Sequence, residues 1–596
     1  MKQHREISLR ALAGPAVVVL AASVAVVPQL MRGNSCGHDF DFHLVSWLDC
    51  LNSWRHGIIY PHWTASVNFG AGEPRFVFYP PLTWMLGAAL GLMLPWKVVP
   101  IALTFLLLAG TGLATRALAR EALDDGAATL AGCAALFSGY SLFTAYERTA
   151  FGELAGGFWI PLLLLFALRD RNQRSGFWRR TFDSSTAALA VVMAGCWLSN
   201  LPVGVMGCYL LAAVAVVAAA LRRSWATVLR ASVGVALGTA LAALYLLPAV
   251  WEQRWVDVRQ ALYDPGLLIE NSWLFARHAN PTMVDHDIEL HKVSVIAVSM
   301  LAVTLTGLAV RRLRGKLVED RTASRSWWIT LALIPVVVLF LLVPVSLPVW
   351  NLLPKLRFLQ FPWRWLVVLE TPMAIFFAGA VWPRKTWMRE AVVAICAIFF
   401  VGATLHAGRT FFQPCDDEDS VAGMLGSFRS GAGFTGYDEY APPGADNGMI
   451  ASGLPDACLV SDPAIELGTT ANRSDADDAI PIWKVTQGSC DTTLAWRVDE
   501  PEHRVLIGAM SHAGFLILRL RSYPNWRVVM NGQPVSSMPQ RSDGLMAISV
   551  PQGSIDLTAD WATTPDVIAS RWLSIVAVLI LVGLWAIGRK LKLPRL

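Results

Sequence analysis

The sequence predicts an all-α polytopic membrane domain of about twelve transmembrane helices, followed by a C-terminal extracytoplasmic domain that resembles a β-sandwich. Of the 596 residues, 55% are hydrophobic and only 16% are charged, and the mean hydropathy is +0.47. Soluble domains rarely have this composition, because so much apolar surface needs lipid to cover it. Several apolar runs approach or exceed the ~18–20 residues that cross a bilayer as a helix.

The first predicted span begins after a basic start that contains Lys2, Arg5 and Arg10, as a signal peptide would. No convincing small-residue cleavage site follows it, so we expect a retained anchor. The predicted spans lie near residues 9–30, 98–116, 127–143, 154–168, 184–199, 203–221, 228–250, 293–312, 327–344, 363–381, 388–406 and 570–588.

The segment 81–95, "PLTWMLGAALGLMLP", decides the topology. If it crossed the membrane, the basic stretches 169–180, 222–230, 311–325 and 384–389 would face outward. Without it, all four face the cytoplasm together with the basic tail, as the positive-inside rule requires. We therefore assign this segment to a re-entrant or interfacial helix on the outer face, with both termini in the cytoplasm.

This topology divides the chain into three parts. Residues 1–406 form the transmembrane domain, in which the large first outer loop covers 31–97. Residues 407–569 form an extracytoplasmic β-rich domain, and 570–596 form the final transmembrane helix with a basic cytoplasmic tail. The remaining outer loops are expected near 144–153, 200–202, 251–292 and 345–362.

The composition changes abruptly after His406. Acidic and polar runs such as "CDDEDS" and "ANRSDADD" come first, and the β-rich runs "HRVLIGAM", "GFLILRLR", "WRVVM" and "GLMAISV" follow. Asn531-Gly532 stands between two apolar stretches, which is the strongest short signal for a β-hairpin. We predict a β-sandwich of roughly 90 residues. The fold alone does not distinguish a structural or lid-like module from a sugar-binding one.

Five of the nine cysteines, Cys36, Cys50, Cys415, Cys458 and Cys490, fall on the predicted outer side, where disulfides persist. Cys36 and Cys50 bracket an Asp/His cluster, so we expect a bridge between them. Cys458–Cys490 is the second expected pair, which leaves Cys415 over. No Cys/His spacing resembles a zinc site.

The Asp/His cluster lies in "CGHDFDFHLVSW", directly after the first span, and consists of His38, Asp39, Asp41 and His43. Asp39 and His43 are four residues apart, so on a helix they share a face and Asp41 points elsewhere. A carboxylate at a membrane surface beside a histidine can act as a general base or bind a divalent cation. A solvated acidic loop without a function is equally consistent with so short a pattern.

The other outer loops bring charged and aromatic side chains close to the membrane. "YERTAFGE" contributes Glu147, Arg148 and Glu153, and "LPKLRFLQFPWRW" contributes Arg357 and Arg364. An arginine such as Arg364 is costly near a span unless it is paired, phosphate-bound or snorkelling to the interface. A local ion pair is the alternative for Glu147 and Arg148. The aromatic loop "NFGAGEPRFVFYPPLTW" suits sugar rings and the membrane interface alike.

Several motifs carry a family resemblance. "HDFDFHL", "RHGIIYPHW" and "NFGAGEPRFVFYPPL" closely resemble the N-terminal loop of the bacterial 6-pyruvoyl-tetrahydropterin-synthase-related membrane proteins. "FLQFPWRWL", "GYDEYAPP" and "SYPNWRVVMNGQPV" are similar to that family and to the YfhO-like proteins. Both groups are similar to the GT-C superfamily of integral-membrane glycosyltransferases.

The resemblance implies a GT-C-like transmembrane domain, a polyprenyl-phosphate sugar donor and an active site on the outer face of the bacterial cytoplasmic membrane. It also implies an acidic catalytic base in the first outer loop, for which Asp39 is the nearest match, with Asp41 and His43 orienting it or the acceptor. Arginine suits the donor phosphate because its guanidinium binds it bidentately. The candidates for this role are Arg364, Arg148 and Arg357. The further outer-loop candidates are His38, Glu147, Glu153 and Tyr79. No cofactor is certain, and a divalent metal, if one is used, falls to Asp39 and Asp41.

We therefore expect a glycosyltransferase that moves a hexose or pentose to a glycan, lipid or protein of the cell envelope. A transporter or lipid flippase is the alternative, since many carriers also have numerous spans with both ends inside. Against a carrier, the predicted spans lack ionisable residues near their centres and show no half-to-half repeat. A catalytically inactive GT-C-like scaffold is a third hypothesis. Membrane lipids are expected partners and nucleic acid is not, because the net charge of +5 is spread over short loops.

Overall fold

The computed structural model describes residues 9–169, 184–260, 265–313, 325–383, 385–467, 482–483 and 490–590. The helices before residue 200 are α1 (Leu9–Ala25), α2 (Val27–Arg32), α3 (Phe40–Arg55), α4 (Arg75–Phe78), α5 (Pro81–Met93), α6 (Val99–Ala119), α7 (Asp125–Leu136), α8 (Gly139–Phe143), α9 (Phe151–Leu154), α10 (Gly156–Leu168) and α12 (Ser184–Ser199). The later helices are α13 (Leu201–Arg222), α14 (Ala226–Leu241), α15 (Ala243–Glu252), α16 (Val284–Leu313), α17 (Arg325–Leu341), α18 (Leu347–Leu352), α19 (Leu366–Val381), α20 (Thr386–Thr410), α21 (Val421–Ser430) and α22 (Pro565–Lys590).

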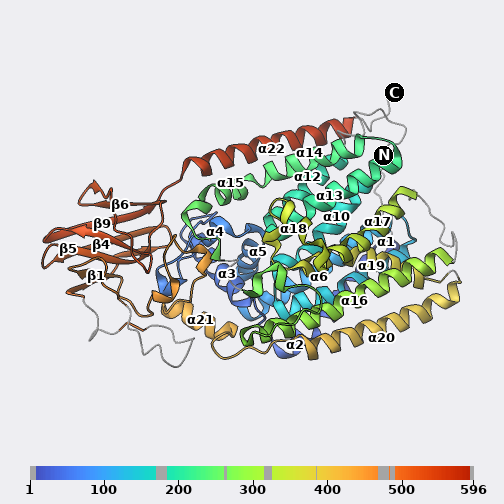
Figure 1. Cartoon of the computed structure of the whole chain (residues 1–596), viewed down its shortest axis with the longest axis horizontal. Helices are drawn as coiled ribbons and strands as arrows, with labels where there is room; N and C mark the ends of the chain where they lie inside the picture. Colours follow the sequence, from blue (N-terminus) through green and yellow to red (C-terminus); the bar gives the residue numbers. More distant parts are fainter. Residues whose placement is uncertain are drawn as a thin grey trace.

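The strands all follow α21 in the described chain. They are β1 (Ala457–Val460), β2 (Thr492–Leu494), β3 (Val498–Glu500), β4 (His503–Met510), β5 (Gly514–Arg521), β6 (Trp526–Met530), β7 (Gln533–Pro534), β8 (Leu545–Val550) and β9 (Gly553–Trp561). Figure 1 shows the long helices gathered in a bundle at one end and the strands at the other, with α3, α4 and α21 between them.

Within the described residues, eight helices are long and apolar enough to cross a membrane, and up to ten spans result if each of two bent pairs counts as one. The bent pairs are Ala226–Leu241 with Ala243–Trp255 and Arg325–Leu341 with Pro344–Leu352. Leu12–Ala25 and Ser184–Ser199 are apolar but shorter. The predicted count of twelve spans is therefore not confirmed.

The second bent pair turns by 95° where Val343 adopts an extended conformation before Pro344. A proline disfavours helical backbone at the residue before it and cannot continue a helix itself, so the apolar run 327–344 is broken. Most of the basic stretches 169–180 and 311–325, which we predicted to face the cytoplasm, lies outside the described residues.

The segment 81–95 contains α5, a helix of 13 residues that packs against α3. Gly87 of α5 lies directly against the Trp47 ring of α3, and a Cβ at this position would collide with it. The small residue therefore permits the close packing that holds α3, and the Asp/His cluster before and within it, on the bundle.

Local signals set the start of two helices that lead into the site described below. Asn200 caps α13, because its side-chain oxygen accepts a hydrogen bond from the Val203 amide at 3.1 Å, and Pro202 sits in the first turn, where its missing N–H is not needed. α16 has Asp287 in its first turn and Arg312 in its last, which complements the helix dipole.

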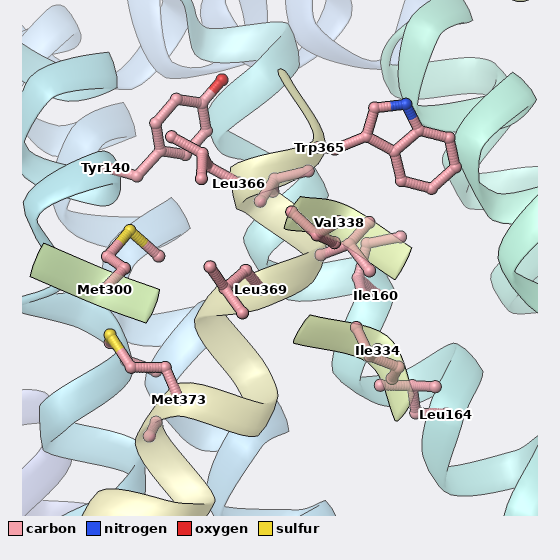
Figure 2. Packing of buried hydrophobic residues seen from close by; sticks show 14 of the residues in the cluster. Tyr140, Ile160, Leu164, Met300, Ile334, Val338, Trp365, Leu366, Leu369 and Met373 are labelled. Atoms are coloured by element: carbon pink, nitrogen blue, oxygen red, sulfur yellow. The ribbon is translucent and has the colours of Figure 1, made fainter. Parts of the chain in front are cut away.

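The bundle has one large apolar core shared by α8, α10, α16, α17 and α19. In the view of Figure 2, Leu369 of α19 lies with Met300 of α16 on one side and Val338 of α17 on the other. Lipid is as apolar as these side chains, so close van der Waals packing is what favours association of the helices. This core fixes the spacing of the helix ends.

The strands form two antiparallel sheets with the orders β2-β1-β5-β8 and β3-β4-β9-β6-β7. Leu516 of β5 and Leu557 of β9 are fully buried in the same apolar cluster, so the sheets pack face to face as in a sandwich. The predicted hairpin is confirmed, because Met530 pairs with Gln533 across Asn531-Gly532 and both turn residues have positive φ, 51° and 76°.

The sandwich packs on the segment 31–97, which we predicted to be the first outer loop. Phe42, Trp63 and Phe78 belong to the same apolar cluster as the strand residues. The Trp63 ring is completely buried and meets the Trp526 ring edge-on at 5.4 Å. The strand-rich part and the segment 31–97 are therefore packed together at one end of the bundle.

One of the two disulfide predictions is correct and the other is wrong. Cys458 is bonded to Cys490 as expected, but Cys36 is bonded to Cys415, and Cys50 is buried with a free thiol. Cys36 precedes α3 while Cys50 lies ten residues beyond its start, and a helix rises 1.5 Å per residue, so about 15 Å of helix separates them. The Cys36 amide instead donates to the Gln413 carbonyl at 3.0 Å.

We expect peptide mapping of the oxidised, non-reduced protein to recover Cys36 linked to Cys415. Cys50 should react with an alkylating reagent only after denaturation, because it is buried on α3. A Cys36–Cys50 peptide would contradict the structure.

Candidate active site

A cavity of about 440 Å³ lies where the segment 31–97, the helix ends and the C-terminal part of the chain meet. It is lined by residues 38–39, 42, 78–80, 148, 150, 153, 200–202, 205, 267, 289, 358–361, 364, 437 and 439–440. Its size is that of a small-molecule site. Its lining combines apolar, aromatic and charged side chains from segments that are far apart in sequence.

Asp39 is held at the edge of this cavity by the loop before α9. It is the residue before α3, its amide donates to the Arg148 carbonyl at 2.9 Å, and its side chain is 37% exposed. The Gly37 amide donates to the Thr149 hydroxyl at 3.1 Å, and a Cβ on Gly37 would collide with the Glu147 carbonyl oxygen. The glycine thus permits the approach that places Asp39 beside Arg148.

Two guanidiniums share one carboxylate in the cavity wall. Arg148 Nη1 lies 2.8 Å from Glu153 Oε2, and Arg364 Nε lies 3.3 Å from the same oxygen. The other Glu153 oxygen accepts a hydrogen bond from the Tyr140 hydroxyl. Arg148 Nη2 is 3.6 Å from Asp39 Oδ2, which is too long for a hydrogen bond. Glu153 therefore orients both arginines, and both line the cavity.

Four of the other candidates do not line the cavity. Asp41 accepts a hydrogen bond from the Tyr437 hydroxyl at 3.4 Å, and burial raises its pKa. Glu147 pairs with Lys292 at 2.6 Å. Arg357 pairs with Glu270 at 2.8 Å and is partly exposed.

His43, the fourth, has a fully buried ring among aromatic side chains. Its centroid is 5.1 Å from that of Phe151 and 6.2 Å from that of Trp47. Neither ring nitrogen has a hydrogen-bond partner in the described part of the chain. Burial lowers the pKa of His43 to about 4, so the ring is neutral at physiological pH. His38 and Tyr79, in contrast, line the cavity.

Sequence reasoning missed several residues of the site. Glu289 lies 3.7 Å from His38 and 3.8 Å from Arg148. Glu439 is half-buried in the cavity lining, and burial raises its pKa to about 7. Glu439 belongs to the motif "GYDEYAPP", whose acidic and aromatic character was the available signal.

A buried ion pair joins α3 to the C-terminal segment. Arg75 Nε lies 2.8 Å from Glu73 Oε1, and Glu73 Oε2 accepts a hydrogen bond from the Tyr437 amide at 3.1 Å. Arg75 also donates to the Phe42 carbonyl at 3.3 Å and to the Ser46 hydroxyl at 3.2 Å. This pair fixes the position of Tyr437 relative to the start of α3.

The prediction that the spans lack ionisable residues near their centres is wrong for α19. Glu370 lies inside the candidate span Pro362–Val381 and is 2% exposed. It accepts hydrogen bonds from the hydroxyls of Ser138 and Ser141 at 2.6 and 2.7 Å. A carboxylate buried inside a span, as Glu370 is, is also a feature of carriers.

In the described residues, no group of three or more His, Cys, Asp and Glu side chains is arranged to hold a metal ion. Asp39 and Asp41, the candidate metal ligands, point to different surroundings, the cavity and Tyr437 respectively.

The model of one protein family, described as a 6-pyruvoyl-tetrahydropterin synthase related domain of membrane proteins, matches residues 76–409, more than half of the chain. The chain belongs to this family. The family resemblance of the sequence motifs is thus confirmed, although Asp39, Asp41 and His43 lie before the matched region. A comparison with curated protein sequences gives no significant match.

Among solved structures, the family member is similar to the oligosaccharyltransferase of Archaeoglobus fulgidus. The apo form is 11% identical with a TM-score of 0.39, over 72% of this chain and 61% of that chain. The complex with Zn and sulfate is 12% identical with a TM-score of 0.33, over 71% and 54%. The chain thus spans less than two thirds of that enzyme's length, and at these TM-scores we base no argument on the similarity.

Proposed function

We propose that this protein is an integral-membrane, GT-C-type glycosyltransferase that transfers a hexose or pentose from a polyprenyl-phosphate donor to an acceptor of the cell envelope. The cavity carries this proposal, because the partly exposed carboxylate of Asp39 and the buried guanidiniums of Arg148 and Arg364 line the same space. A base and an anion-binding pair at a membrane surface are what sugar transfer from a lipid phosphate needs.

In the proposed reaction, Asp39 takes the proton of an acceptor hydroxyl. The acceptor oxygen then attacks the anomeric carbon, and the bond from this carbon to the phosphate oxygen breaks. The polyprenyl phosphate leaves with the electron pair, and Arg148 and Arg364 stabilise its charge by hydrogen bonds. Glu153 holds both guanidiniums in place before the donor arrives, which lowers the entropy cost of binding.

We place the active site on the outer face of the cytoplasmic membrane. The support is that every segment of the cavity lining belongs to, or directly borders, a loop that the positive-inside rule assigns to that face. A lipid-linked donor can reach Arg148 and Arg364 from the bilayer, because both lie in candidate spans. The acceptor is then a glycan, lipid or protein outside the membrane.

Binding of polyprenyl phosphate, without the sugar and without an acceptor, tests the donor site. We expect native mass spectrometry of the full chain in lipid nanodiscs to detect its binding, and Arg148→Lys and Arg364→Lys each to weaken binding about tenfold. Lysine keeps the charge but loses the bidentate geometry, and a hydrogen bond to a charged group contributes about 1.5–3 kcal/mol.

Arg357→Lys is the matched control, since Arg357 pairs with Glu270 and does not line the cavity. It should bind polyprenyl phosphate as the wild type does. Equal binding by all four proteins, or weakening by Arg357→Lys alone, would contradict the proposed donor site.

A carrier is the second candidate, favoured by Glu370, because carboxylates buried inside the membrane commonly serve transport. The two functions differ in their products. A transferase makes a new glycosidic bond and depends on Asp39, whereas a carrier moves its substrate unchanged and would depend on Glu370.

A further inference from the structure

One stretch of the outer C-terminal domain lines the cavity together with Asp39. It contributes Tyr437, Glu439 and Tyr440, which belong to no candidate span. The Tyr440 ring stacks on Phe78 with centroids 6.0 Å apart and an interplanar angle of 13°. These contacts make the C-terminal domain part of the cavity wall and not a separate module.

The stretch is anchored next to the proposed base. The Tyr437 amide donates to Glu73 at 3.1 Å, and its hydroxyl donates to Asp41, two residues after Asp39, at 3.4 Å. The Tyr437 ring also meets the Phe42 ring edge-on at 5.0 Å. Glu439 follows two residues later, so its carboxylate lines the cavity from a fixed backbone.

The carboxyl group of Glu439 suits an acceptor better than a phosphate. The donor phosphate is attracted by the guanidiniums of Arg148 and Arg364, which belong to candidate spans, whereas Glu439 belongs to none. Two carboxylate oxygens can each accept a hydrogen bond from a neighbouring sugar hydroxyl. Tyr437 and Tyr440 line the cavity beside this carboxylate, and aromatic side chains suit a sugar ring.

We propose that Tyr437, Glu439 and Tyr440 form the acceptor subsite and that the acceptor is a carbohydrate whose hydroxyls bind to Glu439. The proposal rests on the proposed function for its place in the reaction, since it puts the acceptor hydroxyl beside Asp39. It assigns binding of the acceptor to the C-terminal domain and binding of the donor to the transmembrane helices.

Saturation-transfer NMR of the full chain in lipid nanodiscs tests this subsite without the reaction. The probes are four neutral trisaccharides: mannotriose, arabinotriose, maltotriose and chitotriose. Above about pH 7, the value to which burial raises the pKa of Glu439, we expect at least one to bind the wild type. Under these conditions Glu439→Gln should weaken its binding about tenfold or more, because the charge-assisted hydrogen bonds are lost. Glu439→Asp, which keeps the carboxylate, should retain part of the affinity.

Asp438→Asn is the matched control, because Asp438 is adjacent but exposed and does not line the cavity. It should bind the trisaccharide as the wild type does, and equal unfolding midpoints of the three variants show that each is folded. Failure of all four trisaccharides to bind, or equal binding by the wild type and Glu439→Gln, overturns the subsite.

The same samples separate this inference from the proposed function. If the wild type does not bind polyprenyl phosphate but trisaccharide binding depends on Glu439, the donor site fails and the carbohydrate subsite stands. If polyprenyl phosphate binds and depends on Arg148 while no trisaccharide binds, the subsite fails and the donor site stands.

Discussion

Replacing Asp39 by asparagine is expected to slow sugar transfer by about 10²–10⁴-fold, because a base that takes a proton in the transition state contributes a factor of this order. Asparagine has nearly the same shape, and within the described residues the ionic contact of the Asp39 side chain is a long one, at 3.6 Å to Arg148. The variant should therefore fold and bind polyprenyl phosphate. The measurement is the rate at which purified protein releases polyprenyl phosphate from polyprenyl-phosphate sugars.

Asp41→Asn is the control for this prediction. Asp41 has the same side chain two residues away, but it contacts Tyr437 and does not line the cavity. Its loss should slow transfer much less. If Asp41→Asn abolished transfer while Asp39→Asn kept it, the roles of the two carboxylates would be exchanged. Full activity in both variants would contradict a catalytic role for this loop.

Replacing Arg75 by methionine is expected to lower the free energy of unfolding by about 3–5 kcal/mol, because removing one partner of a buried ion pair leaves the other charge uncompensated. Arg75 and Glu73 are 1% and 0% exposed, and the charged atoms are 2.8 Å apart. Chemical denaturation in detergent micelles measures the change.

A double variant tests whether the pair itself causes this loss. Glu73→Gln combined with Arg75→Met removes both charges, so it should be less destabilised than the sum of the two single variants. Strict additivity would show that Arg75 and Glu73 do not stabilise each other. A change below about 1 kcal/mol for Arg75→Met would contradict the burial of an ion pair at this place.

The helical bundle followed from the sequence because apolar runs of membrane length are a strong signal. The number of membrane spans was less predictable. Pro344 breaks one apolar run at Val343, and Ser184–Ser199 falls short of a full span. Mean hydropathy is averaged over a run of residues as long as a span, so it does not detect where the backbone turns.

The sequence predicted the part of the candidate site that lies at helix ends on the predicted outer side of the membrane. Asp39, Arg148, Glu153 and Arg364 meet in one cavity for this reason. Arg357 has the same chemistry as Arg364, but its side chain turns to Glu270. Sequence spacing does not determine such a direction, because tertiary packing sets it.

Contacts between distant segments were the part that sequence could not supply. Cys36 lies closer in sequence to Cys50 than to Cys415, yet the intervening helix keeps the first pair apart. Glu439 enters the cavity only because the C-terminal segment folds back onto Phe42 and Phe78. The sequence around Glu439 does not indicate that this segment contacts Phe42 and Phe78.

The central claim is that this family member forms glycosidic bonds and that Asp39 is the base. Mass spectrometry of the cell-envelope glycans and lipids from a deletion strain, complemented with the wild type or with Asp39→Asn, tests it most directly because no donor or acceptor has to be chosen. We predict that one envelope glycan loses a hexose or pentose on deletion, that the wild type restores it, and that Asp39→Asn does not. An unchanged glycan profile on deletion, or full restoration by Asp39→Asn, would contradict the claim.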